Sequence, residues 1–282
     1  MTLSTRRRFF LALAALLLTS LAPAQADEEM DAILKRGRLS FAVYNEFPPY
    51  SDNEKGLDVD IAKALAAKLG LKAEIIGFKA GEEMADDLRN MVWKGHYLRG
   101  NPADVMMRVP VDPILAKAND KVRIFAPYHY EVIGMARVAS RVPAPAGSAA
   151  VALEVFTREK IGVEGESLAD SFLLSVLRGR LKENVVHFRT IAEAAKALRE
   201  DSIAAIMAPR GELEGALGGD TRFVIDEAKL GELNPKGWPV GMAVKAEAAD
   251  LSTALAGALA ELQKDGTVAA IFKKHGVTLQ TH

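Results

Sequence analysis

Two arginines occupy positions from which they could bind an anion. Arg108 directly follows the segment 104–107, which is apolar after Asp104, and Arg210 closely follows the apolar segment 203–208. Both segments are typical of short buried strands, so both side chains would lie at the carboxyl ends of strands, where open α/β sheets usually bind ligands. A guanidinium group can bind a carboxylate through two parallel hydrogen bonds. The alternative is a surface ion pair with an acidic residue such as Glu212, worth under about 1 kcal/mol.

No set of side chains has the pattern of a catalytic centre. The histidines lack metal-ligand spacing, such as a pair at i and i+4 with an acidic third ligand. The segment 162–167 lacks the lysine that reaches a phosphate, and it ends in Ser167, which is suited to cap the next helix. Neighbouring acids such as Glu164 and Glu166 are usually solvated. The sequence therefore favours a protein that is not an enzyme and has no metal or cofactor.

The composition indicates a globular protein without thiol chemistry. The 282 residues include 36 Lys and Arg against 37 Asp and Glu, and the two signs are interleaved along the chain. This balance provides no basic track for nucleic acid. The chain contains no cysteine, which excludes disulfides, thiolate metal sites and cysteine nucleophiles.

The N-terminus has the features of an export signal. A basic head with a twin-arginine look at 6–8 precedes an apolar run at 11–18, and a small-x-small sequence ends at Ala26. A membrane anchor is the alternative, but the apolar run is shorter than the roughly 20 residues that span a bilayer. We expect a signal peptide at 1–26, cleavage after Ala26, and a mature protein in the periplasm.

Strand and helix patterns alternate in both halves of the mature chain, as in α/β layers where helices connect parallel strands. Alternating apolar residues predict strands, and apolar residues three and four apart predict helices. In the first half we predict strands at 39–44, 72–78 and 104–107, and helices at 59–69 and 84–93. In the second half we predict strands at 160–163, 185–188 and 203–208, and helices at 167–177 and 191–198. The last stretch predicts a strand at 239–244 and helices at 251–262 and 267–274 that pack on the first half.

Six segments follow one another in an order that is typical of one protein family. They are 33–39, Phe47-Pro48-Pro49-Tyr50, 56–62, Phe125-Ala126-Pro127-Tyr128, 162–167 and 262–267. Together they resemble the bacterial extracellular solute-binding proteins of family 3, the amino-acid ABC transporter type, over nearly the whole mature chain.

The resemblance implies the periplasmic binding protein type II fold. This α/β fold has two lobes, each a mostly parallel sheet flanked by helices, joined by two crossover strands. We expect lobe 1 to comprise 27–133 and 241–282 and lobe 2 to comprise 134–240, with crossings near 130–138 and 239–244. A ligand would lie in the cleft between the lobes, which close by hinge motion.

The resemblance also implies which side chains face the ligand. In the closed molecule, Arg108 and Arg210 would converge from opposite lobes on an anion, beside Ser167 and the amides of 165–168 at a helix N-terminus. The loop after the first strand would line the mouth of lobe 1, although its aromatic rings could instead pack locally between prolines. The expected ligand-binding residues are Tyr44, Glu46, Phe47, Tyr50, Arg108, Tyr128, Ser167 and Arg210.

The chain departs from the family where an amino acid is usually bound. Family members use an arginine for the α-carboxylate and an acidic residue for the ammonium group. The segment 111–117 contains no arginine, and Pro209 and Arg210 stand where the acidic residue would fall. A zwitterion would leave both charges unpaired in the expected positions, which is unfavourable by several kcal/mol in a desolvated cleft.

The segment 86–102 is longer than the family's usual helix and turn. Trp93 is suited to the core of lobe 1. His96, Tyr97 and Arg99 are residue types that are common on binding surfaces, and we expect them to contact a partner. Together with the segment 109–112, this insert is similar to the periplasmic accessory proteins associated with quinoprotein alcohol dehydrogenases.

The sequence therefore predicts a monomeric periplasmic binding protein that captures a small, anionic ligand for an ABC-type uptake system. Its partner would be an ABC permease. The alternative is an accessory protein that binds a periplasmic quinoprotein (methanol) dehydrogenase and helps to mature or activate it, without transporting a solute.

Overall fold

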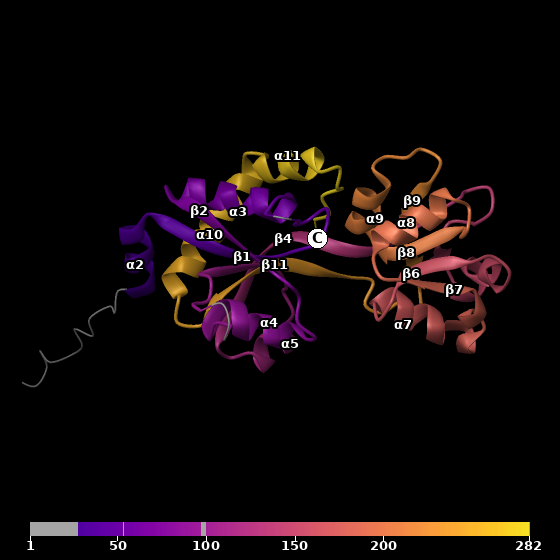
Figure 1. Cartoon of the computed structure of the whole chain (residues 1–282), viewed down its shortest axis with the longest axis horizontal. Coiled ribbons are helices and arrows are strands. Elements are labelled where there is room, and N and C mark those ends of the chain that lie inside the picture. Colours follow the sequence, from indigo (N-terminus) through magenta and orange to yellow (C-terminus); the bar gives the residue numbers. More distant parts are fainter. Residues whose placement is uncertain (1–27, 53, 97–99, 282) are drawn as a thin grey trace, which may run out of the picture.

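Two α/β lobes lie side by side along the longest axis of the molecule (Figure 1). The computed structural model describes residues 28–52, 54–96 and 100–281. The expected signal peptide at 1–26 and the candidate partner residues Tyr97 and Arg99 lie outside the described residues. No helix within the described ranges is both long and apolar enough to cross a membrane.

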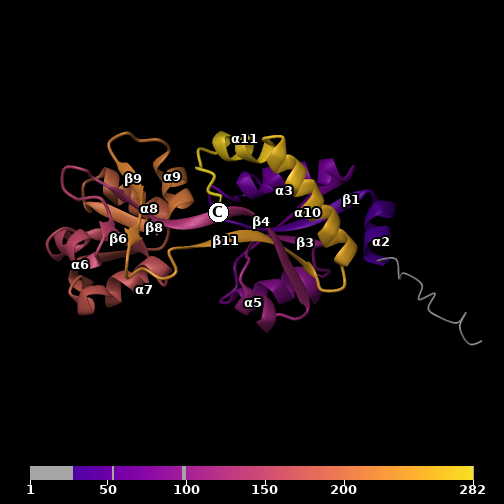
Figure 2. The same ribbon diagram turned by 180° about the vertical axis from the view of Figure 1, so that it is seen from behind.

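Two strands connect the lobes. β4 (Val122–Arg137) and β11 (Gly237–Lys245) pair antiparallel and run from one lobe into the other, and both are visible from either side (Figures 1 and 2). Nine of the described strands form one continuous sheet. Its order is β2 (Lys72–Phe78), β1 (Arg38–Tyr44), β3 (Val105–Pro110), β11, β4, β8 (Ala205–Pro209), β6 (Ile161–Glu164) and β7 (Val185–Phe188), with β9 (Val224–Glu227) beside β4. The predicted lobe boundaries at 133/134 and 240/241 each fall inside one of these two strands.

Lobe 1 builds its parallel layer from the first part of the chain. β1 (Arg38–Tyr44) pairs in parallel with β2 (Lys72–Phe78) and β3 (Val105–Pro110). Helix α3 (Leu57–Lys68) buries an apolar stripe against this layer, because its leucines and isoleucines recur four residues apart. The other helical elements in this part of the chain are α2 (Glu28–Arg36), α4 (Met84–Leu88), the π-helical turn η1 (Arg89–Trp93) and α5 (Pro113–Ala118).

The chain returns to lobe 1 at its C-terminal end. α10 (Ala249–Lys264) and α11 (Thr267–Lys274) share one apolar core with α3, which confirms the prediction that the closing helices pack on the first half. Figure 2 shows both helices, in yellow, beside α3. The segment after α11 then reaches lobe 2, where the Thr278 amide donates to a Glu214 carboxylate oxygen at 2.7 Å.

Lobe 2 repeats the α/β arrangement on a smaller scale. β6 (Ile161–Glu164) pairs in parallel with β7 (Val185–Phe188) and β8 (Ala205–Pro209), while β8 and β9 (Val224–Glu227) pair antiparallel with β4. The flanking helices are α6 (Ala149–Ala152), α7 (Leu168–Ser175), α8 (Ile191–Arg199) and α9 (Arg210–Leu217). Short 3-10 turns lie at Glu154–Thr157, Val176–Gly179 and Lys182–Asn184, and β5 (Ala146–Gly147) pairs with β10 (Lys229–Leu230).

The predicted strands and helices all occur, but one side chain differs from expectation and helices α2, α5, α6 and α9 were not predicted. Trp93 is 37% exposed at the end of η1, so its prediction as a core residue is wrong. The π-helical turn places Met91 and Val92 in the core instead. Helix α9 was not predicted, because Gly211 and Gly215 lower its helix propensity and interrupt its apolar pattern.

Candidate ligand-binding cleft

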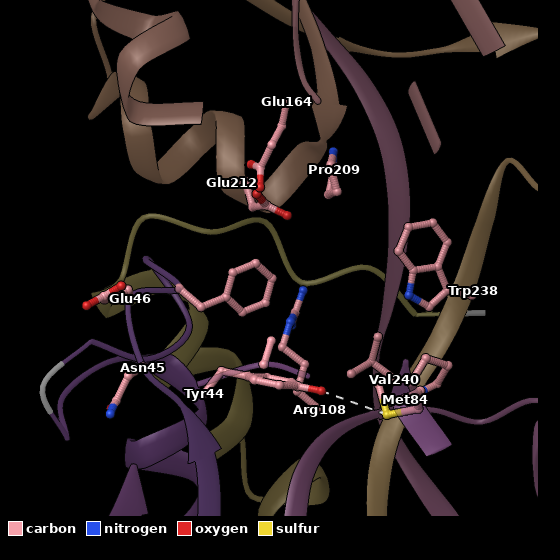
Figure 3. A pocket seen from close by; sticks show the side chains of 13 residues that line it. Tyr44, Asn45, Glu46, Met84, Arg108, Glu164, Pro209, Glu212, Trp238 and Val240 are labelled. Atoms are coloured by element: carbon pink, nitrogen blue, oxygen red, sulfur yellow. Dashed lines mark hydrogen bonds between the residues drawn. The ribbon is translucent and has the colours of Figure 1, made fainter. Parts of the chain in front are cut away.

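A pocket of about 420 Å³ lies between the lobes (Figure 3). A second hollow of about 460 Å³ adjoins it and shares four of its residues. Both volumes are within the range of pockets that bind small molecules. Lobe 1 supplies Tyr44, Asn45, Glu46, Phe47, Ala80, Met84, Arg108 and Pro110, lobe 2 supplies Glu164, Pro209 and Glu212, and β11 supplies Trp238 and Val240.

A bulge between β3 and β11 positions Arg108 in this pocket. Met242 pairs with Met107 and Gly241 pairs with Val109, so Arg108 is the extra residue on its strand. Its backbone φ of 60° is in the left-handed region, which residues other than glycine rarely adopt. Gly241 is required opposite the bulge, because a Cβ there would lie 2.7 Å from the Val111 side chain and 3.0 Å from the Ala126 carbonyl oxygen.

Arg108 is buried against an acid and two aromatic rings. Its Nη2 donates to Oε2 of Glu131 at 2.6 Å, and its Cζ lies 3.1 Å from the Tyr50 ring centroid and 5.2 Å from the Phe47 ring centroid. The residue is 8% exposed, and its Nη1 has no hydrogen-bond partner. Figure 3 shows the side chain extending from lobe 1 toward Glu212. One donor of this guanidinium group is therefore buried and unsatisfied.

Glu131 is the anionic centre behind the pocket. It is 1% exposed and accepts a hydrogen bond of 2.5 Å from the Tyr50 hydroxyl, while the His129 Nε2 lies 3.9 Å away. Burial would raise its pKa, but the neighbouring His129 and the Arg108 charge favour the carboxylate and together hold the pKa at about 2. Because Glu131 is ionised, it neutralises the charge of Arg108 within lobe 1.

The lobe 2 wall carries carboxyl groups instead. Burial raises the pKa of Glu212 to about 8, with a further contribution from the Glu131 charge and an opposing one from Arg108. Burial also raises the pKa of Glu164, against a hydrogen bond from the Ile191 amide. No cation forms a salt bridge to either group among the described side chains. This wall therefore lacks the charge compensation that Glu131 and Arg108 give each other in lobe 1.

The structure brings four of the predicted ligand-binding residues together at the pocket. Tyr44, Glu46, Phe47 and Arg108 all line it. Tyr50 lies beneath the Arg108 guanidinium group and is fully buried. Of the three residues of the insert that were predicted to contact a partner, the structure describes only His96. It lines a separate hollow on lobe 1 that also includes Asp87 and Asn90.

The other three predicted residues lie outside the pocket lining. The Tyr128 hydroxyl donates to Asp58 at 2.8 Å inside lobe 1. Arg210 forms an ion pair of 2.8 Å with Glu214, one turn further along α9, and borders a different hollow. Ser167 caps α7 by accepting from the Asp170 amide at 3.1 Å.

The loop before α7 has few amides to offer an anion. The Gly165 amide donates to the Phe188 carbonyl, the Ser167 amide donates to the Glu164 carbonyl, and the Glu166 amide donates to the Asp170 carboxylate. What this loop presents to the cleft is the Glu164 side chain. The arrangement thus offers a carboxyl group where an anion cradle was expected.

Sequence reasoning missed Glu212, Glu131 and Trp238 as parts of the site. The only signal for Glu212 was its place just after the strand 203–208, and it was interpreted there as a surface partner of an arginine. Glu131 and Trp238 lie on the crossover strands and are paired directly in register. Within the described ranges, no group of three or more acidic or histidine side chains is arranged to hold a metal ion.

Comparisons with known proteins place the fold but not the family. No protein-family model matches the chain, and no curated protein matches it. An ancestral cationic amino acid solute-binding protein is similar in structure, with a TM-score of 0.69, 19% identity, and coverage of 88% of this chain and 99% of that one. A second structure of this ancestral protein is described as a precursor of cyclohexadienyl dehydratase.

Two bacterial proteins have the same architecture. One is an amino acid ABC transporter substrate-binding protein from Streptococcus pneumoniae bound to L-arginine, with a TM-score of 0.60, 18% identity, and coverage of 91% of this chain and 100% of that one. The other is a solute receptor for L-cysteine from Neisseria gonorrhoeae, with a TM-score of 0.56, 24% identity, and coverage of 87% and 92%. The chain therefore has the two-lobed periplasmic binding protein fold of amino-acid solute receptors.

Proposed function

We propose that this protein is a periplasmic solute-binding protein that holds one small polar ligand between its lobes and delivers it to an ABC permease. The observation that carries the proposal is the pocket between the lobes, with the Arg108 side chain on one wall and carboxyl groups on the other. The export-signal pattern at 1–26 and the similarity in fold to amino-acid receptors support the location and the class of function.

The charged groups around the pocket favour a different ligand from the anion that the sequence predicts. Arg108 is already neutralised by Glu131, and Arg210 is paired with Glu214 away from the pocket. The unpaired Nη1 of Arg108 is buried, so a ligand with an acceptor group would bind it after the side chain shifts toward the cleft, and the charge of the donor would strengthen that hydrogen bond. The same ligand would need a donor, preferably cationic, for Glu212. We propose an amphoteric solute such as an amino acid.

Binding of such a ligand would involve a proton. With a pKa of about 8, Glu212 is mostly protonated at neutral pH in the ligand-free protein. A cationic group beside it favours the carboxylate and lowers its pKa, so the side chain loses its proton as the ligand binds. Affinity for an amino-bearing ligand should therefore rise with pH between about 6 and 8.

The test is calorimetric titration of the mature protein with the standard amino acids and with simple carboxylates. We expect saturable binding of at least one amino acid with one site per chain. Glu212→Gln should weaken that binding by about tenfold or more, because it removes a charged hydrogen bond. The exposed Glu183→Gln is the matched control. Binding of plain carboxylates alone, unaffected by Glu212→Gln, would contradict the proposed ligand class.

The accessory role with a quinoprotein dehydrogenase stays a prediction from the sequence. Its main support was the insert, and Tyr97 and Arg99 lie outside the described residues. Purification of the tagged protein from periplasm distinguishes the two partners. A co-purifying permease supports uptake, whereas a co-purifying quinoprotein dehydrogenase supports the accessory role.

A further inference from the structure

Arg108 occupies a site that has the chemistry of a receptor for a free cation. We infer that its side chain is a built-in guanidinium ligand, and that the site it fills binds a free guanidinium ion once the side chain is removed. We call this site the cation cage and define it by Phe47, Tyr50 and Glu131. The inference deepens the proposed function, because it explains what the lobe 1 wall of the same cleft excludes.

The contacts of the cation cage match those that recognise guanidinium groups. The Arg108 Cζ lies 3.1 Å from the Tyr50 ring centroid and 5.2 Å from the Phe47 centroid, both within the range of cation–π attraction. Glu131 accepts from Nη2 at 2.6 Å and is held by the Tyr50 hydroxyl. Two aromatic faces and an oriented carboxyl group are therefore present without any contribution from the Arg108 backbone.

The backbone of Arg108 makes the occupant separable from the cage. Its φ of 60° favours glycine, and the residue is the extra one in a bulge, so it has no strand partner on β11. Arg108→Gly therefore removes the side chain while relieving backbone strain. The cage residues come from other segments, since Phe47 and Tyr50 lie in the loop after β1 and Glu131 lies on β4.

Removal of the Arg108 side chain leaves the buried Glu131 carboxyl group without its cationic partner. Glu131 is 1% exposed, and a buried carboxylate that loses its cation is highly unfavourable. A small planar cation that enters the space restores both the ion pair and the ring contacts. In the native protein the Arg108 side chain fills this space and closes it to cationic ligands, and its unpaired Nη1 is itself buried.

The direct test is titration of Arg108→Gly with methylguanidinium, followed by calorimetry and by thermal unfolding. We expect the variant to bind methylguanidinium about tenfold or more tightly than the native protein does, and to gain thermal stability from it. Arg108→Gly combined with Glu131→Gln should lose that gain. A folded Arg108→Gly that binds methylguanidinium no better than native protein would overturn the inference, as would equal binding by the double variant.

A matched control separates the cage from general effects of guanidinium. Arg222 also lies near an aromatic ring, 5.1 Å from the Phe223 centroid, and pairs with Asp220, but its side chain is 60% exposed. Arg222→Gly should show no gain in methylguanidinium affinity, because water already solvates its surroundings. Tetramethylammonium at equal concentration controls for ionic strength and for a cation without hydrogen-bond donors.

A measurement on the native protein keeps the inference testable if Arg108→Gly does not fold. In ¹⁵N-arginine-labelled protein, the Arg108 guanidinium protons, assigned by their absence in Arg108→Lys, should be shifted upfield by the Tyr50 ring and should rotate slowly. An Arg108 signal with free rotation and no ring shift would refute the cage.

The outcomes also separate this inference from the proposed function. If the native protein binds no solute while Arg108→Gly gains methylguanidinium, the cage exists and the proposed function fails. If the native protein binds an amino acid while Arg108→Gly gains nothing, the proposed function stands and the cage fails.

Discussion

The two walls of the cleft solve the problem of buried charge differently. In lobe 1, Arg108 and Glu131 neutralise each other at 2.6 Å, and two aromatic rings cover the pair. In lobe 2, Glu212 is buried and Glu164 is half-buried, neither has a salt bridge to a cation among the described side chains, and the pKa of each is raised. The first wall is electrostatically complete before a ligand arrives, whereas the second is not.

This difference indicates which wall selects the ligand. A wall whose charges are already paired gains little from an added ion, whereas a wall whose carboxyl groups have no cationic partner gains a charged hydrogen bond when a cationic donor arrives. We therefore expect lobe 1 to hold the acceptor end of a ligand through one donor atom, and lobe 2 to discriminate by charge.

The largest effect should come from breaking the lobe 1 pair. Glu131→Gln leaves Arg108 buried without an anion, and we expect a loss of about 3–5 kcal/mol in the free energy of unfolding. Urea denaturation measures it. Glu159→Gln is the control, because its partner Arg141 is one-third exposed, and it should lose under about 1 kcal/mol. Equal losses in the two variants would contradict the account, because burial would then add nothing to the effect of breaking the Arg108–Glu131 pair.

The lobe 2 wall should respond in the opposite direction. The pKa of Glu212 rises from 4.5 to about 8 on folding, so the folded state binds this proton more tightly and stability falls as pH rises between these values. Glu212→Gln removes this pH-dependent loss of stability, because glutamine does not ionise. We expect the variant to match the native protein near pH 4.5 and to exceed it by an amount on the order of a few kcal/mol above pH 8. Urea denaturation across this pH range measures the difference, and parallel pH profiles would contradict it.

A smaller effect on stability should come from the contact between α9 of lobe 2 and Tyr50 of lobe 1. A Cβ on Gly211 of α9 would clash with the Tyr50 hydroxyl, so Gly211→Ala forces α9 away from lobe 1 and should destabilise the protein by about 1–3 kcal/mol. Gly257→Ala in α10 is the matched control, since its Cβ meets open space, and it should stabilise the protein by about 0.5–1 kcal/mol. Thermal unfolding compares the two. Stabilisation by both substitutions would show that the lobes do not contact each other at Gly211.

The smallest effect should come from Arg210. Its ion pair with Glu214 is partly exposed, so Arg210→Ala should change the free energy of unfolding by under about 1 kcal/mol and leave ligand affinity unchanged. Calorimetry with any ligand identified by the amino-acid panel checks this expectation. A large loss of affinity would show that Arg210 turns into the cleft when ligand binds.

The order of the elements could be predicted from the sequence because it is a local property. The strand 185–188 and the helix 267–274 were predicted with the bounds that the structure has, since their apolar periods are short and regular. Helix α9 was missed because its glycines serve the contact with lobe 1, where Pro49 lies 2.8 Å from a Cβ placed on Gly215. In that helix, packing between lobes determines the residue choice instead of helix propensity.

The site was only partly predictable because its pairings are not local. Arg108 was recognised as a site residue, but its partner Glu131 lies on another strand, and only the register of β3, β11 and β4 brings the two together. The pairing of Arg210 was visible as a glutamate four residues further along a helix, but that helix had not been predicted. The raised pKa of Glu212 follows from burial between lobes, which no single segment encodes.

The central claim is that a solute binds between the two walls, and Trp238 is positioned to report it. The chain has two tryptophans, and Trp93 is 37% exposed, so Trp93→Phe leaves Trp238 in the pocket as the single emitter. The measurement is its fluorescence during titration with an amino acid that binds by calorimetry. We predict a saturable change in emission with the calorimetric affinity, and calorimetric binding with unchanged Trp238 emission would contradict the account.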